Sequence, residues 1–230
     1  MGILNLTPDS FYEPSRYNIA VLDSGADIID IGACSTRPGY APVSVEEEWK
    51  RLEPVLRMIA EERPGLKVSI DTFHSEIVRR AYGVLGPFIV NDVSAGDADP
   101  LMLDTVAGLG LQYIAMHHEA ASDVSQVAEF FDRFEEKAGK AGIEDWILDP
   151  GFGFGKEIED NWAILRGLSS LKRFGRPVLV GLSMKRMTGH SARKTDEANL
   201  VALRQGADIL RVHDVAAARK VLNGYLEETI

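Results

Sequence analysis

The chain contains a single cysteine, Cys34, so no disulfide can form within it. A lone cysteine is typical of a protein kept in a reducing compartment, and we expect a cytoplasmic location. The sequence also lacks an apolar run of about 18 residues, which a membrane-spanning helix needs. Its first residues show neither the basic nor the apolar region of a signal peptide. These absences predict a globular protein with no membrane partner.

Basic residues are scarce. Lys and Arg number 25 against 35 Asp and Glu, which gives a net charge of −10 and a pI near 5.0. This balance argues against nucleic acid or an anionic membrane as the main partner. An anion can still bind such a protein, but only where cations gather locally.

No low-complexity segment or Ser/Gly linker divides the chain, and short apolar runs alternate with amphipathic stretches throughout. The apolar runs predict strands at Gly2–Leu6, Ile28–Gly32, Lys67–Asp71, Phe88–Val93, Leu111–His117, Trp146–Asp149, Val178–Ser183 and Ile209–Val215. The amphipathic stretches predict helices at Val45–Glu62, Ser75–Tyr82, Pro100–Gly108, Gln126–Ala141, Asn161–Phe174 and Ala198–Gln205.

These strands are too hydrophobic to leave one face in water, which indicates a parallel sheet covered by helices. About eight β/α units in 230 residues predict an α/β protein with one domain over residues 1–230, a closed (β/α)8 TIM barrel. No Gly-x-Gly-x-x-Gly follows the first strand, which weakens the doubly wound alternative.

Polar residues close nearly every expected strand. They are Asn5, Asp30, Asp71 with Thr72, Asn91 with Asp92, His117 with His118, Asp149, Ser183 with Lys185, and Arg211 with His213. A single polar residue at such a point usually caps the next helix, and we interpret Ser44 and Asp160 in that way. The recurrence of both charges at strand ends instead predicts an active site, because these ends meet on one face of a barrel.

The segment Asp149-Pro-Gly-Phe-Gly-Phe-Gly-Lys156 follows the sixth expected strand. Its glycines allow the backbone to approach a ligand closely, and its phenylalanines can form apolar walls. A carboxylate beside such a slot suits a planar heterocycle that presents N–H donors. The alternative is a tight Gly-rich turn with a turn-stabilising Asp.

Two groups of candidate binding residues emerge. The first can pair with the edge of an amide-like ring: Asp71, Asn91, Asp149 and Lys185. The second can form an anion site: Asn5, Arg37, Arg211 and His213. Arg211 and His213 stand at i and i+2 on the last expected strand, so we expect their side chains to share a face. The alternative for these two is a surface salt bridge with Asp214.

The chain resembles the dihydropteroate synthase family. The resemblance rests on segments that span nearly the whole chain in family order: residues 1–11, 30–39, 69–72, 91–94, 116–117, 149–156, Ser183-x-Lys185 and Arg211-Val-His-Asp-Val215. It implies a (β/α)8 barrel that forms a homodimer. It also implies a reaction in which p-aminobenzoate displaces pyrophosphate from 6-hydroxymethyl-7,8-dihydropterin pyrophosphate to form 7,8-dihydropteroate, so the partners are these small-molecule substrates.

The same resemblance implies roles for individual residues. The pterin would be held by Asp71, Asn91, Asp149 and Lys185, with Phe154 as an apolar wall. Asn5 would bind Mg²⁺ on the diphosphate, which Arg37, Arg211 and His213 would also contact. Thr36, Pro38 and Ser183 would help to form the p-aminobenzoate pocket. The catalytic set would be Asp71, Asp149, Lys185, Arg211 and His213, and Cys34 would be structural because no nucleophile is needed.

Three departures from the family pattern are visible. Met184 stands where the family has an arginine, only 13 residues separate Phe11 from Gly25, and only 20 separate Lys185 from Gly206. Two other functional hypotheses are open, and the departures support the second of them. One is a methyltetrahydrofolate:corrinoid methyltransferase domain, which shares the barrel but needs no diphosphate site. The other is a non-catalytic, pterin-binding homologue with a structural or regulatory role.

Overall fold

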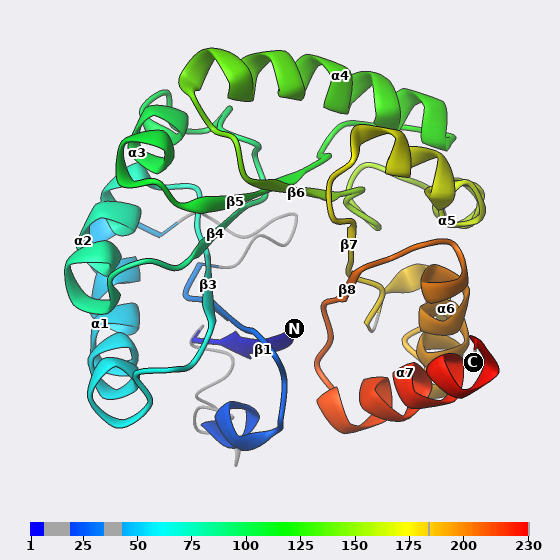
Figure 1. The fold of residues 1–230 in the computed structure, drawn as a ribbon, viewed down its shortest axis with the longest axis horizontal. Coiled ribbons are helices and arrows are strands. Elements are labelled where there is room, and N and C mark those ends of the chain that lie inside the picture. Colours follow the sequence, from blue (N-terminus) through cyan, green and yellow to red (C-terminus); the bar gives the residue numbers. More distant parts are fainter. Residues whose placement is uncertain (7–18, 35–42, 184, 230) are drawn as a thin grey trace.

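The computed structural model describes residues 1–6, 19–34, 43–183 and 185–229. In this part of the chain, eight parallel strands surround a central axis and the helices lie outside them (Figure 1). The strands are β1 Gly2–Asn5, β2 Ile29–Gly32, β3 Val68–Asp71, β4 Ile89–Asp92, β5 Gln112–Met116, β6 Trp146–Asp149, β7 Leu179–Val180 and β8 Ile209–Leu210.

Backbone pairing closes these strands into a ring. Strands β1 to β6 form one sheet in sequence order, and β7 pairs with β8. Parallel bridges join the two parts, from Leu148 to Val178 on one side and from Gly2 to Val212 on the other. The Ile3 amide donates to the Val212 carbonyl at 3.0 Å, which ties β1 to the segment after β8. The predicted closed (β/α)8 barrel is therefore confirmed.

The last two strands are shorter than the sequence predicted. The expected strand Ile209–Val215 ends at Leu210, and Val215 already begins helix α7, Val215–Thr229. Asp214 accounts for the change because its carboxylate accepts the Ala217 amide at 2.9 Å and starts the helix. The polar residues after Leu210 therefore lie in a loop.

The other helices are α1 Val45–Glu62, α2 Ser75–Leu85, α3 Met102–Leu109, α4 Val124–Ala141, α5 Ile158–Arg166 and α6 Ala192–Arg204. Short 3₁₀ helices cover η2 Ile19–Asp23, η3 Leu168–Phe174 and η4 Arg186–Thr188. The expected helix Asn161–Phe174 is thus two elements, divided at Gly167. Ser44 caps α1 as predicted, whereas Asp160 acts from the third position of α5, where it accepts the amide of the capping residue Glu157.

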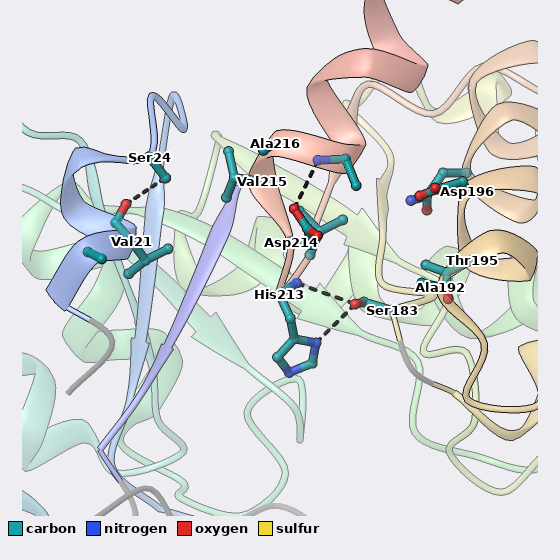
Figure 2. Close-up of a pocket in the computed structure, with 14 residues that line it drawn as sticks. Val21, Ser24, Ser183, Ala192, Thr195, Asp196, His213, Asp214, Val215 and Ala216 are labelled. Atoms are coloured by element: carbon teal, nitrogen blue, oxygen red, sulfur yellow. Dashed lines mark hydrogen bonds between the residues drawn. The ribbon is translucent and has the colours of Figure 1, made fainter. Parts of the chain in front are cut away.

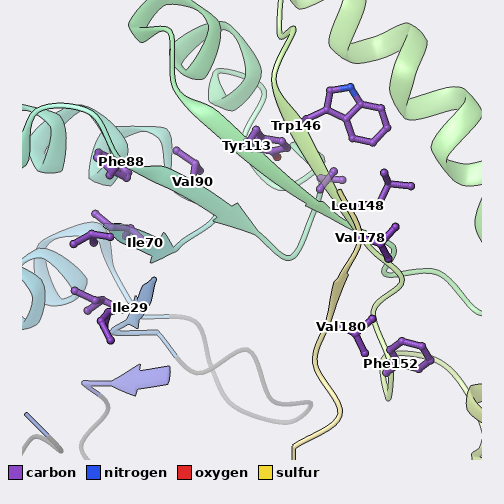
Figure 3. Close-up of a cluster of buried hydrophobic side chains, with 14 of the residues drawn as sticks. Ile29, Ile70, Phe88, Val90, Tyr113, Trp146, Leu148, Phe152, Val178 and Val180 are labelled. Carbon is purple, nitrogen blue, oxygen red and sulfur yellow. The ribbon is translucent and has the colours of Figure 1, made fainter. Parts of the chain in front are cut away.

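The hydrophobic residues form two separate layers. The larger cluster lies between the sheet and the helices and includes Tyr113, Trp146 and Leu148 (Figure 3). A smaller cluster fills the inside of the barrel with six residues: Met1, Ile28, Ile89, Ile114, Ile147 and Leu179. Several of these precede or begin their strands, so the apolar filling lies toward the amino ends. Polar side chains at the carboxyl ends can therefore face a site at the opposite end of the barrel.

No helix among the described residues is both long and apolar enough to cross a membrane.

Candidate active site

Arg211 lies at the centre of a buried polar network. The guanidinium reaches two carboxylates on neighbouring strands, with Nε at 2.6 Å from Asp30 Oδ2 and Nη2 at 2.8 Å from Asp71 Oδ2. Asp30 is completely buried and also accepts hydrogen bonds from Ser69 Oγ at 2.6 Å and from the Asn91 amide at 3.2 Å. Strands β2, β3 and β4 are adjacent, so their inward side chains meet beneath the guanidinium.

These contacts exclude the alternative that the sequence left open for Arg211. The surface salt bridge with Asp214 is wrong, because Asp214 caps α7 and Arg211 pairs with Asp30 and Asp71. Strand-like pairing continues past Leu210, because the Val212 amide donates to the Met1 carbonyl at 3.0 Å, so the shared face of Arg211 and His213 stays a prediction. The His213 side chain contacts Ser183, with Nδ1 at 3.0 Å from the hydroxyl oxygen.

Burial and charge act in opposite directions in this network. Burial raises the pKa of Asp71, against the lowering effect of Arg211. For Arg211, burial disfavours the charge, but the carboxylates of Asp30 and Asp71 more than offset it and raise the guanidinium pKa. Two carboxylates facing one cation leave a local excess of acceptors, which suits a ligand that presents N–H groups.

The Gly-rich segment after β6 folds over Asp149. The Asp149 carboxylate, 7% exposed, accepts the Gly151 amide at 2.8 Å. Burial raises the pKa of Asp149, while that hydrogen bond and the cations Arg211, Lys185 and Lys156 act to lower it. Gly151 has φ +65°, and a Cβ there would lie 1.9 Å from the His117 carbonyl oxygen. Only glycine fits this close approach of two loops.

Lys185 lies beside the same loop. Its ammonium nitrogen is 4.7 Å from the centre of the Phe154 ring, a cation–π contact. A Cβ at Gly153 would lie 3.2 Å from Cδ of Lys185, so the lysine chain passes directly along the loop backbone. The structure thus brings Asp149, Phe154 and Lys185 to the same end of the barrel, as the sequence predicted.

Lys156 was not assigned a role from the sequence, although it ends the Gly-rich motif. Its ammonium donates to the carbonyls of Phe154 at 2.9 Å, Gly151 at 3.0 Å and His117 at 3.4 Å. The side chain is buried, and burial lowers the pKa of Lys156 to about 8. Lys156 is thus an internal clamp that holds the Gly-rich loop against the loop after β5.

Two further buried groups were also missed. Asp30 was noticed only as one polar strand end among several, yet it joins Ser69, Asn91 and Arg211. Glu48 lies fully buried on α1, and its Oε2 is 2.6 Å from His74 Nδ1. The available signal was an acidic residue on the apolar face of an amphipathic helix.

Three predicted site residues, Thr36, Arg37 and Pro38, lie outside the described residues, as does Met184. Asn5 ends β1 with an exposed side chain. No group of three or more His, Cys, Asp or Glu that could hold a metal occurs within the described ranges.

Cys34 is buried, and burial raises the pKa of its thiol, which agrees with a structural role.

A cavity of about 520 Å³ opens next to this site, between η2, α6 and the start of α7 (Figure 2). Ser183 and His213 line it, whereas Asp71, Asn91, Asp149, Lys185 and Arg211 do not. The predicted site residues therefore divide into a polar slot inside the barrel mouth and a pair at the edge of a separate cavity.

Barrel and slot define an enzyme of the pterin-binding class, and a family model described as "Pterin binding enzyme" matches residues 1–213. The chain is 38% identical to the dihydropteroate synthase of Escherichia coli strain K12 over 245 aligned positions, which cover 94% of this chain and 86% of the relative. The chain belongs to the dihydropteroate synthase family. The predicted family and its enzyme class, a transferase of folate synthesis, are therefore confirmed.

Solved structures agree with this assignment. Dihydropteroate synthase of Xanthomonas albilineans with 4-aminobenzoic acid is 38% identical, with a TM-score of 0.90 over 100% of this chain and 92% of that one. The same enzyme in complex with 7,8-dihydropteroate gives 35% identity and a TM-score of 0.88 over the same shares. The Escherichia coli alignment is longer than the 230 residues of this chain, so the relative carries additional residues within it.

Proposed function

We propose that the chain condenses 6-hydroxymethyl-7,8-dihydropterin pyrophosphate with p-aminobenzoate to form 7,8-dihydropteroate and pyrophosphate. The observation that carries the proposal is the slot in which buried Asp149 faces Lys185 and the Phe154 ring. Relatives of the same fold hold 4-aminobenzoic acid or 7,8-dihydropteroate, the co-substrate and the product of this reaction.

The slot can recognise the pterin by hydrogen bonding and stacking. The Asp149 carboxylate uses one hydrogen bond for Gly151 and has further lone pairs for the N–H edge of the ring. The Lys185 ammonium can donate to a ring oxygen or nitrogen, and Phe154 supplies an apolar surface. Asp71 and Asn91 lie on the adjacent strands β3 and β4 and complete the polar lining.

The reaction needs stabilisation of charge rather than a protein nucleophile. The p-aminobenzoate nitrogen attacks the exocyclic methylene carbon, the C–O bond breaks, and its electron pair leaves with pyrophosphate. The attacking nitrogen then loses a proton to water. Positive charge that develops on the methylene spreads into the pterin, where the carboxylates of Asp149 and Asp71 stabilise it.

The leaving diphosphate needs cations at the slot. Arg211 uses Nε and Nη2 for Asp30 and Asp71. A guanidinium has five N–H donors, so we assign the Nη1 donors to the diphosphate. His213 can contribute a ring N–H donor, and Arg37 and the p-aminobenzoate ligands Thr36, Pro38 and Ser183 are assigned by family motif.

Among the described residues, the site suits Mg²⁺ only if the substrate supplies most of the ligands to the ion. Asn5 offers one exposed amide oxygen, a hard donor, and no carboxylate cage occurs in the described ranges. Mg²⁺ commonly keeps several waters and binds mainly through substrate phosphates, which a single protein ligand permits. We propose that Asn5 holds Mg²⁺ that arrives with the substrate, where the ion would neutralise charge on the diphosphate.

Two further expectations accompany this proposal. We propose a homodimer, for which the support is the family resemblance and the exposed Leu226 near the end of α7, 49% accessible. We propose a cytoplasmic location, which a single buried cysteine favours. Sedimentation of the purified chain tests the first, and localisation of a tagged chain tests the second.

The decisive assay measures pyrophosphate release from the pterin substrate with and without p-aminobenzoate. Asp149→Asn should weaken pterin binding by about tenfold to a hundredfold, because an unmatched buried polar group costs about 1–3 kcal/mol. Asp145→Asn, at an exposed carboxylate that bonds Gln112, is the matched control. Pterin binding without pyrophosphate release would indicate the non-catalytic homologue. Methyl transfer from methyltetrahydrofolate to a corrinoid would indicate the methyltransferase.

A further inference from the structure

We propose that the cavity between η2, α6 and α7 is a binding site for a small organic amine, distinct from the pterin slot. Its volume of about 520 Å³ lies within the range of small-molecule sites. Residues on η2 form one wall and residues on α6 form the opposite wall, with the segment His213–Ala216 between them (Figure 2).

A buried acceptor without a partner lines this cavity. Asn199 on α6 is 1% exposed, and its Oδ1 has no hydrogen-bond partner among the described residues. Thr195 lies one turn earlier on the same face, but its hydroxyl already donates to the Ser191 carbonyl at 2.9 Å. Buried polar atoms are nearly always paired. An N–H donor in the cavity would satisfy Asn199.

The charges on the cavity wall favour a cation. Of the described residues that line it, Asp196 and Asp214 are acidic and none is a lysine or an arginine. The helix starts that face the cavity are already capped, α6 by Ser191 and α7 by Asp214. An anion would therefore meet two carboxylates and few available amide donors. A protonated amine is attracted by the carboxylates and can donate to Asn199.

Apart from Ser24, Ser183 and His213, the rest of the described wall consists of alanine and valine, which favours an organic body over a hydrated metal ion. Val21, Val212 and Val215 are buried along the cavity. Val21 and Val215 can both lie against the backbone of β1 because Gly2 has no side chain. A Cβ at Gly2 would lie 3.0 Å from a methyl group of Val21 and 2.9 Å from one of Val215. One rim is open, since Ala192, Asp214 and Ala216 are exposed. A ring or branched chain that carries one amine matches this wall.

The position of the cavity links it to the proposed reaction. Ser183 and His213 both line it, and His213 Nδ1 is 3.0 Å from the serine oxygen. An amine seated there would lie beside a residue proposed to contact the diphosphate. An effect on turnover rests on the proposed function, but amine binding itself does not.

The test uses benzylamine as the probe and the full chain as the protein. Calorimetry should show binding of benzylamine, with a Kd on the order of millimolar for so small a ligand, and none of benzoate. We expect Asp196→Asn to weaken binding at least fivefold. Asn199→Leu, which keeps the side-chain shape but removes the acceptor, should weaken it at least tenfold. Asp104→Asn on α3 is the matched control, since it removes an exposed carboxylate outside the cavity.

Three results would overturn the proposal. One is equal binding of benzylamine and benzyl alcohol, which would show that charge is irrelevant. Another is unchanged benzylamine affinity in both Asp196→Asn and Asn199→Leu. The third is a homodimer that does not bind benzylamine and that Ala216→Glu dissociates. That result would mean that a second copy of the chain fills the cavity. Pyrophosphate release without benzylamine should be the same in Asn199→Leu as in the unaltered chain, so either proposal can fail alone.

Discussion

The buried ammonium of Lys156 allows a quantitative prediction about stability and pH. Burial lowers the pKa of Lys156 from 10.5 to about 8, and the side chain is only 8% exposed. In the unfolded chain the amine keeps its proton until about pH 10.5. Between these values the unfolded state binds more protons than the folded state, so stability increases with pH in this window. Below pH 8 both states are protonated, and the cost of burying the charge is constant.

The size of the effect follows from the shifted pKa. Each pKa unit corresponds to about 1.4 kcal/mol, and at pH 9.5 the native amine is about 1.5 pH units above its pKa. We therefore expect Lys156 to contribute about 2 kcal/mol more to the free energy of unfolding at pH 9.5 than at pH 7. Other groups also titrate in this range. The quantity to measure is the difference between the unaltered chain and Lys156→Met, which has a similar length and no charge.

Urea denaturation at pH 7, 8.5 and 9.5 gives this difference directly. Lys140→Met, a substitution of an exposed lysine at the end of α4, supplies the matched baseline. A difference that is flat or falls with pH would refute the reasoning. In that case the three carbonyls of His117, Gly151 and Phe154 would hold the proton more strongly than burial repels it.

Two other substitutions test buried groups of the barrel mouth. Burial lowers the pKa of His117 from 6.5 to about 3, so the unfolded chain takes a proton that the native ring refuses, and stability falls as pH decreases below 6.5. His117→Phe should remove about 2 kcal/mol of the loss between pH 7 and pH 5, measured by urea denaturation; an unchanged loss would contradict this. Arg211→Met should cost about 3–5 kcal/mol, because it leaves Asp30 and Asp71 buried without their cation. Adding Asp71→Asn should recover part of this stability, and a further loss in thermal unfolding would argue against the pairing.

Some features of the site were predictable because they depend on short-range patterns. Alternation of apolar runs and helical stretches located the eight strands, and the end of β6 at Asp149 was placed correctly. The carboxyl ends of parallel strands must meet on one face, so the convergence of Asp71, Asn91 and Asp149 followed from their positions alone. Ser44 was identified as a cap because a lone polar residue before a helical stretch usually has that role, and its side chain does accept the Glu47 amide.

Other expectations failed where a local pattern was ambiguous. The run Ile209–Val215 looks like a strand, but Asp214 offers the Ala217 amide a better partner than a ladder would, and the helix starts there. The stretch Asn161–Phe174 has one helical periodicity, yet the α-helix ends at Arg166 and a 3₁₀ helix begins at Leu168. Such competition between local and distant partners is not visible in periodicity.

The sequence by itself determined the barrel class, the order of its strands and the family, because these depend on periodicity and on contiguous motifs. Only the tertiary structure decided which charges pair. Arg211 meets Asp30, 181 residues away, because ring closure brings β8 against the first strands. In the same way, the Lys156 clamp and the cavity beside Asn199 exist only once loops and helices distant in the chain are packed together. Contacts of this kind depend on distances across the barrel, which no local pattern of residues encodes.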